Sequence, residues 1–120
     1  MDLATMRTRV RRDLRDEDAA NYRWTDDEVD RHIARAVQEV SLAAPLEAST
    51  TLTTTAGSRE LSIAGLTSRV SVEAAEYPVG QYPRCLVPFT TWADTLAMLI
   101  DGTPGAGESV LVRYTKLHTL

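Results

Sequence analysis

The chain has 120 residues, of which 43% are apolar and 25% are charged, and its formal net charge is −4. This composition is typical of one folded domain or two small modules, and it excludes a disordered chain. The acidic balance argues against a dedicated nucleic-acid-binding protein, which needs a basic field to neutralise phosphates.

The cysteine content and the apolar runs exclude further classes. The single cysteine, Cys85, excludes an intrachain disulfide and a cysteine-based zinc site. The longest apolar run, 96–100, is far shorter than the ~20 residues that a membrane span needs. The N-terminal residues lack the apolar segment of a secretory signal. We therefore expect a cytosolic or particle-borne protein without a membrane partner.

The first 45 residues predict two amphipathic helices. Asp2 is a suitable N-cap for the first helix, and apolar residues at positions 3, 6, 10 and 14 form one stripe along it. A polar stretch over 16–21 interrupts this pattern. Thr25 is the predicted N-cap of the second helix, with Glu28 in the capping-box position and Trp24 placed to pack on Val29. Pro45 ends the second helix, whose apolar face is expected to comprise Val29, Ile33, Ala36, Val37 and Val40.

Charge is concentrated in this helical segment. Arginine outnumbers lysine twelve to one in the chain, and five arginines fall between positions 7 and 15. Acidic residues follow at 16–18 and 26–28. One interpretation is a solvated helix face with local ion pairs. Another is a surface that binds an acidic partner or runs beside DNA, because arginine forms oriented, bidentate pairs. A GC-rich genome would produce the same excess of arginine.

The residues after Pro45 change to a β pattern. We expect strands over 48–55, 59–64, 69–77, 86–92, 95–100 and 109–117, with turns between them. Val70, Val72 and Ala74 are expected to share one face of their strand, and Pro88 implies an edge strand or a bulge. The predicted fold class is α+β: an N-terminal αα-hairpin over 1–45, then a small antiparallel β-sheet, sandwich or meander of about five to six strands over 46–120.

Residues capable of catalysis or metal binding are few and scattered. His32 has only Glu28 at a ligand-like spacing, and Cys85 lacks any local sign of an activated thiol, so we expect a surface imidazole and a partly buried thiol. Glu73 and Glu76, three apart on a strand, point to opposite faces unless a bulge intervenes. No phosphate-binding loop or hydrolase motif occurs. We predict no catalytic, cofactor-binding or metal-binding residue, and hence no enzyme.

Three segments carry a resemblance to a known family. They are RRDLRDEDAANYRWTDDEVDRHI over 11–33, EAAEYPVGQYP over 73–83, and VRYTKLHTL over 112–120. Their layout of helix, acidic link, aromatic residue, Thr-Asp cap and second helix resembles that of tailed-phage head–tail adaptor (connector, or head-completion) proteins. The family usually continues into further helices after the last strand, whereas this chain ends at Leu120.

The resemblance implies a structural virion protein of the head–tail neck, assembled in the host cytoplasm. Adaptors of this family form a ring, typically of twelve copies, beneath the portal protein. The ring extends the DNA channel without sequence-specific binding and gives neck or tail proteins a docking platform. Opposite charges on separate parts of a subunit suit the head-to-tail contacts of such a ring. The expected subunit or partner interface comprises Arg7, Arg9, Arg11, Arg12, Arg15, Asp16, Glu17, Asp18, Trp24, Asp26, Asp27 and Glu28.

Two other functions remain open at this stage. A small DNA-binding regulator would use the arginine-rich first helix and bind duplex DNA with steep salt dependence. A β-rich receptor- or carbohydrate-binding tail module would need clustered exposed aromatic side chains. The candidates for such a cluster also fit a core or a hairpin loop, and they are Tyr77, Tyr82, Phe89 and Trp92.

Overall fold

A computed structural model describes the whole chain, residues 1–120. The elements in chain order are α1 (Leu3–Leu14), a short 3₁₀ helix (Ala19–Asn21), α2 (Asp26–Ala43), β1 (Leu46–Thr53), β2 (Glu60–Ser62), β3 (Arg69–Glu76), β4 (Phe89–Trp92), β5 (Thr95–Met98) and β6 (Ser109–Lys116). The predicted α+β class is confirmed, with two helices followed by two small antiparallel sheets of six strands in total. None of the helices combines the length and the hydropathy needed to span a membrane.

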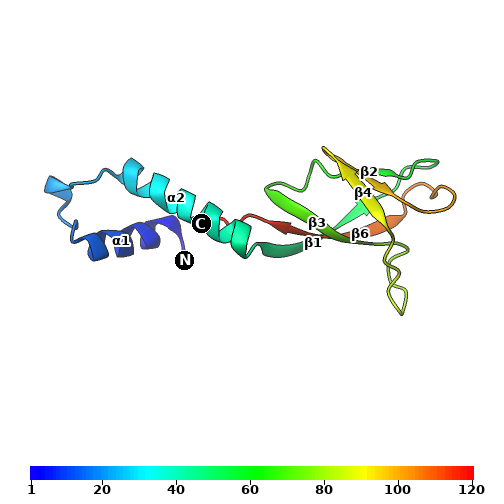
Figure 1. The fold of residues 1–120 in the computed structure, drawn as a ribbon, viewed down its shortest axis with the longest axis horizontal. Coiled ribbons are helices and arrows are strands. Elements are labelled where there is room, and N and C mark those ends of the chain that lie inside the picture. The colour runs from blue at the N-terminus through cyan, green and yellow to red at the C-terminus, as the bar shows by residue number, and fades with distance from the viewer. The chain divides into compact units, whose positions relative to one another are not determined.

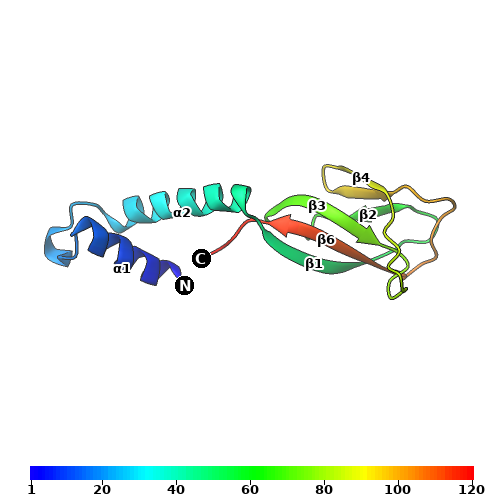
Figure 2. The same ribbon diagram turned by 60° about the horizontal axis from the view of Figure 1, so that its bottom comes forward.

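Contacts divide the chain into two units. The helical unit comprises residues 1–45 and 117–120, and the β unit comprises residues 46–116. The ribbon in Figures 1 and 2 shows the helices of the first unit and the strands of the second. Each unit is described below by itself.

Both helices of the helical unit begin at the predicted caps. The Asp2 carboxylate accepts a hydrogen bond of 2.8 Å from the Thr5 N–H, and the Thr25 hydroxyl accepts one of 3.2 Å from the Glu28 N–H. These oxygens satisfy N–H groups that have no partner within a helix. α1 ends at Arg15, which has a left-handed backbone (φ 57°) and donates its N–H to the carbonyls of the last turn.

The two helices lie side by side and antiparallel in both views (Figures 1 and 2). Val29 and Ile33 of α2 are buried, and Val37 is half-buried. The C-terminal end of the predicted apolar face is not covered, since Val40 is 59% exposed. Length explains this difference, because α1 has 12 residues and α2 has 18. The shorter helix therefore does not reach far enough to cover Val40.

The C-terminal residues 117–120 also belong to the helical unit. The backbone N–H of His118 donates to the Ser41 hydroxyl at 2.9 Å, and the His118 ring nitrogen Nε2 donates to the Ala44 carbonyl at 2.8 Å. Ser41, which is fully buried, donates in turn to the Val37 carbonyl at 2.6 Å. These bonds fasten the end of the chain to the end of α2.

The β unit consists of two three-stranded antiparallel sheets, with strand orders β1-β6-β3 and β2-β5-β4. In Figure 2, β2 and β4 lie in a layer over β1, β3 and β6. The two sheets enclose a common apolar core, as expected of a small sandwich, since each must bury its apolar face. The buried residues of this core are Leu61, Ile63, Leu66, Ala75, Leu96, Met98, Val110 and Val112.

The central strand β6 pairs differently with its two neighbours. Its pairing with β1 is regular over eight residues, whereas its pairing with β3 contains two β-bulges. Each bulge interrupts the alternation of side chains, so Ala75 and Glu76 are buried while Val70 is 39% exposed. The prediction that Val70, Val72 and Ala74 share one face is wrong for this reason.

The segment around Pro88 divides between the two sheets. Leu86 forms an isolated bridge with Glu76 of β3, and the Val87 N–H donates to the Ala75 carbonyl at 2.9 Å. β4 then starts at Phe89 and lies at the edge of the other sheet, which confirms the edge strand expected from Pro88. The proline therefore marks the point where the chain passes from one sheet to the other.

Candidate functional site

Arg11 lies at the centre of the charged region of the helical unit. Its side chain is only 5% exposed, and its Nη1 lies 2.9 Å from Asp16 Oδ2. Its Nη2 donates to the Trp24 carbonyl at 3.0 Å and to Asp26 Oδ1 at 2.7 Å. The guanidinium carbon lies 3.6 Å from the centre of the Tyr22 ring, a cation–π contact. One arginine of α1 thus joins the link between the helices to the start of α2.

Asp16 completes this cluster from the link. Besides Arg11, its carboxylate accepts hydrogen bonds from the backbone N–H groups of Arg23 at 2.8 Å and Trp24 at 3.1 Å. The pKa of Asp16 lies below its ordinary value, mainly because the carboxylate accepts the hydrogen bond from the Arg23 N–H. The Trp24 N–H and Arg11 lower this pKa further. The carboxylate is therefore held in its charged form by donors from both sides of the link.

A second ion pair joins the two helices further along. Arg7 donates to Asp30 through Nε at 2.8 Å and through Nη2 at 2.7 Å, which makes the pair bidentate. The hydrogen bonds from Arg7 lower the pKa of Asp30. Arg7 also lies 3.9 Å from Asp26, so the two clusters share a carboxylate.

The twelve residues predicted for an interface have different surroundings in the structure. Six of them form ion pairs within the chain: Arg7, Arg11, Arg12, Asp16, Glu17 and Asp26. Asp18 accepts hydrogen bonds from the Ala20 N–H and the Asn21 amide. Trp24 is 42% exposed and contacts the guanidinium of Arg23. Arg9, Arg15, Asp27 and Glu28 form no ion pair, so these four charges remain free for a contact with another molecule.

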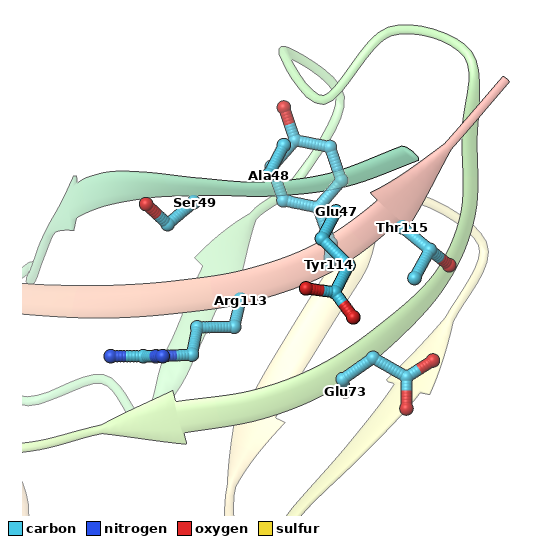
Figure 3. Close-up of a pocket in the computed structure, with 7 residues that line it drawn as sticks. All are labelled: Glu47, Ala48, Ser49, Glu73, Arg113, Tyr114 and Thr115. Atoms are coloured by element: carbon cyan, nitrogen blue, oxygen red, sulfur yellow. The ribbon is translucent and has the colours of Figure 1, made fainter. Parts of the chain in front are cut away.

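The β unit has a polar groove that sequence reasoning missed. It has a volume of about 670 Å³ and lies over β1, β6 and β3. In Figure 3 the Arg113 guanidinium extends away from the carboxylates of Glu47 and Glu73. None of these three side chains takes part in an ion pair of the chain. From the sequence, the alternation of side chains assigns each of these residues to one face of its own strand. The groove forms only because β1 pairs with β6, and these two strands lie far apart in the sequence. The lining residues are Glu47, Ala48, Ser49, Glu73, Arg113, Tyr114 and Thr115.

The remaining candidate side chains do not converge. His32 is exposed, as expected, but Cys85 is also exposed, so the prediction of a partly buried thiol is wrong. The structure contains no group of three or more His, Cys, Asp or Glu residues that could hold a metal ion. Tyr77 and Phe89 pack against the core of the β unit.

The other two aromatic candidates are solvent-exposed. Tyr82 is 99% exposed in the loop before β4, and Trp92 is 85% exposed at the end of β4. They lie on separate segments, and Tyr77 and Phe89 contribute to the core instead. The four residues therefore do not form one aromatic surface.

Comparison with known proteins shows which protein family the chain matches. The model of one protein family, described as SU10 adaptor protein, matches residues 1–116. The match covers the helical hairpin and every strand of the β unit. No curated protein matches the sequence.

Proposed function

Because the chain belongs to the SU10 adaptor protein family, a family of phage head–tail adaptors, we propose that its copies assemble into a ring beneath the portal protein. The family establishes the coarser role: the protein is a structural adaptor of a phage, a virion component that contacts head and tail proteins. In our proposal the ring contains twelve copies, extends the DNA channel and presents a platform to neck or tail proteins. The family match over residues 1–116 is the observation that carries the proposal.

The distribution of charge within the helical unit supports assembly through selected residues. The ion pairs around Arg7 and Arg11 hold the hairpin together, which leaves fewer charges for contacts between subunits. The free cations Arg9 and Arg15 lie on α1 and at its end, and the free carboxylates of Asp27 and Glu28 lie in the first turn of α2. Opposite charges at separate places suit a head-to-tail contact.

Apolar side chains near the end of α2 support a protein partner for the helical unit. Val40 and Leu42 are 59% and 63% exposed. Because residues two apart on a helix point to different sides, these side chains leave exposed apolar surface on more than one side of this end of α2, which a protein partner could cover. We assign this end of α2 to the interface with a neighbouring subunit or with the portal protein.

The two other functions receive less support from the arrangement of side chains. A DNA-binding regulator would present its arginines to phosphates, but Arg7 and Arg11 are engaged by carboxylates of the same chain. A carbohydrate-binding module would gather aromatic side chains, but Tyr82 and Trp92 lie on separate segments. The net charge of −4 instead suits a channel wall along which DNA slides without binding.

Electron microscopy of the protein mixed with the portal protein of the same phage tests the proposal. We expect an added ring of density on one face of the portal, with twelve copies of the chain. Portal particles alone serve as the control for density that the portal itself contributes. Portal particles that bind no chain, or that bind it without a closed ring, would contradict the proposal.

A further inference from the structure

The four edge strands of the β unit differ in how well they are protected. An edge strand presents unpaired N–H and C=O groups, and proteins usually guard such edges with bulges, charges, short strands or covering segments. β3 has two bulges, and residues 86 and 87 cover part of it. β2 has only three residues and includes the charged Glu60. β1 and β4 lie at the edges of two different sheets and have no bulge; β1 has one charge in eight residues, and β4, although only four residues long, has no charge.

β1 offers the longer of these two unprotected edges. The Thr54 N–H, directly after the strand, donates to the Glu108 carbonyl at 2.8 Å and so faces β6. Because backbone direction alternates along an antiparallel strand, the residues at 47, 49, 51 and 53 direct their N–H and C=O groups away from β6. β1 has no proline or lysine, and Glu47 is its only charged residue.

β4 offers a shorter edge on the other sheet. The Leu99 N–H donates to the Pro88 carbonyl at 2.8 Å, so the same alternation directs the backbone groups of Phe89 and Thr91 away from β5. β4 contains no charged residue and no proline. Trp92 at its end is 85% exposed, although a tryptophan is among the side chains that gain most from being covered.

We propose that β1 of one copy pairs edge to edge with β4 of the next copy, so that a sheet continues from subunit to subunit. This inference rests on the proposed ring. A ring needs two different surfaces on each subunit, and two unprotected edges on two sheets supply them. A second copy pairing β1 with β1 would close a dimer and leave β4 bare. Because β4 is uncharged, Glu47 meets no like charge in the β1–β4 contact.

Two proline variants test the contact. Thr51→Pro and Thr91→Pro each remove one outward N–H, and neither removes an N–H that bonds within the chain. Thr51→Val and Thr91→Val are the matched controls, because they keep the N–H and favour a strand. In native mass spectrometry over a range of concentrations, we expect the natural chain and both valine variants to form complexes. Each proline variant should remain a monomer with an unchanged circular dichroism spectrum.

Mixing the two proline variants tests the direction of the contact. The intact β1 of Thr91→Pro should pair with the intact β4 of Thr51→Pro, which gives a one-to-one complex and nothing larger. Assembly of Thr91→Pro alone would overturn the pairing of β1 with β4 in favour of β1 with β1. Assembly of both variants alone would overturn the use of these edges and leave the proposed ring intact.

Hydrogen exchange of the natural chain gives a readout that does not depend on the variants. The amides of Ser49, Thr51 and Thr91 should exchange rapidly in the monomer and become protected in the assembled form. Exchange that stays rapid after assembly would overturn the pairing even if a proline variant misfolds. A natural chain that stays monomeric at every concentration and also with the portal protein would overturn the proposed ring together with this contact.

Discussion

Arg11 and Asp16, five residues apart in the chain, form the most buried ion pair of the protein. Their side chains are 5% and 8% exposed, and Arg11 Nη1 lies 2.9 Å from Asp16 Oδ2. The left-handed Arg15 reverses the chain between them, so the carboxylate returns to the last turns of α1. The pair therefore fixes where the chain leaves the first helix and, through Trp24 and Asp26, where it enters the second.

Arg11→Lys should destabilise the helical unit strongly. A lysine ammonium cannot reproduce the planar fork that reaches Asp16, Trp24 and Asp26 together. Arg12→Lys is the matched control, because Arg12 is 72% exposed and its pair with Glu17 is long, at 3.6 Å. The control should change the free energy of unfolding by no more than about 0.5 kcal/mol. Thermal unfolding followed by helical circular dichroism measures both, and equal losses in the two variants would contradict the central place of Arg11.

Acid should weaken the helical unit through its carboxylates. Asp2, Asp16, Asp18 and Asp30 all have a pKa below the ordinary value, caused mainly by hydrogen bonds from Thr5, Arg23, Asn21 and Arg7 respectively. Because these pKa values are lower in the folded chain, the stabilisation is fully present above the unfolded pKa of about 3.9. It is lost as the pH falls through the lower folded values.

Asp16→Asn tests how much the Asp16 carboxylate contributes to this loss of stability in acid. The variant should be less stable than the natural chain at pH 7 and should lose less stability between pH 5 and pH 2, as measured by unfolding in urea. Asp13→Asn is the control, since Asp13 is exposed and accepts no hydrogen bond. An unchanged pH profile in Asp16→Asn would show that this carboxylate does not stabilise the fold.

The free charges of α1 give a test of charge complementarity between subunits. Replacing Arg9 and Arg15 with Glu should prevent assembly while helical content stays the same, because neither residue forms an ion pair within the chain. A variant with Glu at positions 7, 9 and 11 should also fail to assemble, but it would break the Arg7–Asp30 and Arg11–Asp16 pairs as well. Native mass spectrometry measures the assembly of both variants. Intact rings formed by the variant with Glu at positions 9 and 15 would refute charge complementarity between subunits.

Leu96→Ala should destabilise the β unit. Leu96 is fully buried between the two sheets, and removing its methyl groups leaves a cavity that costs about 2–5 kcal/mol. Leu99→Ala makes the same chemical change three residues away, where the side chain is 55% exposed, and should cost less than about 0.5 kcal/mol. Urea unfolding of the two variants compares them. Similar losses in the free energy of unfolding of the two variants would contradict the buried position of Leu96 in the core.

Thr54→Val should loosen the loop before β6. The buried Thr54 hydroxyl donates to the Gly105 carbonyl at 2.6 Å and accepts from the Glu108 N–H at 2.9 Å. Valine keeps the shape but leaves both groups without this partner, at a cost of about 1–3 kcal/mol. Hydrogen exchange at Glu108 should accelerate. The exposed Thr53→Val is the control, and its Glu108 amide should exchange as in the natural chain.

Features that depend on neighbouring residues were predictable from the sequence. Asp2 and Thr25 cap their helices as expected, because a cap requires only a suitable side chain and a following helix. Pro88 predicted an edge strand or a bulge, because proline lacks an N–H, and the strand after it lies at a sheet edge. The approximate strand positions followed from alternation and turn residues.

Features that depend on distant residues were not predictable in the same way. Arg7 and Asp30 are 23 positions apart, and nothing in either neighbourhood selects the other as its partner. The bulges in β3 arise from its pairing with β6. They change which side chains of β3 point into the core, so the buried face differs from the one that simple alternation predicts. The groove over Glu47 and Arg113 likewise exists only because β1 and β6 are neighbours. Half of the predicted interface residues proved to form ion pairs within the chain for the same reason.

The position of β6 has a consequence for synthesis. This strand is the central partner of both β1 and β3, yet it is the last of the six strands in chain order. On the ribosome, the sheet of β1, β6 and β3 therefore cannot form until residues 109–116 have been made, whereas α1 and α2 can pair early. A nascent chain halted before residue 109 should hold a helical hairpin followed by strands that are open to chaperones and to proteases.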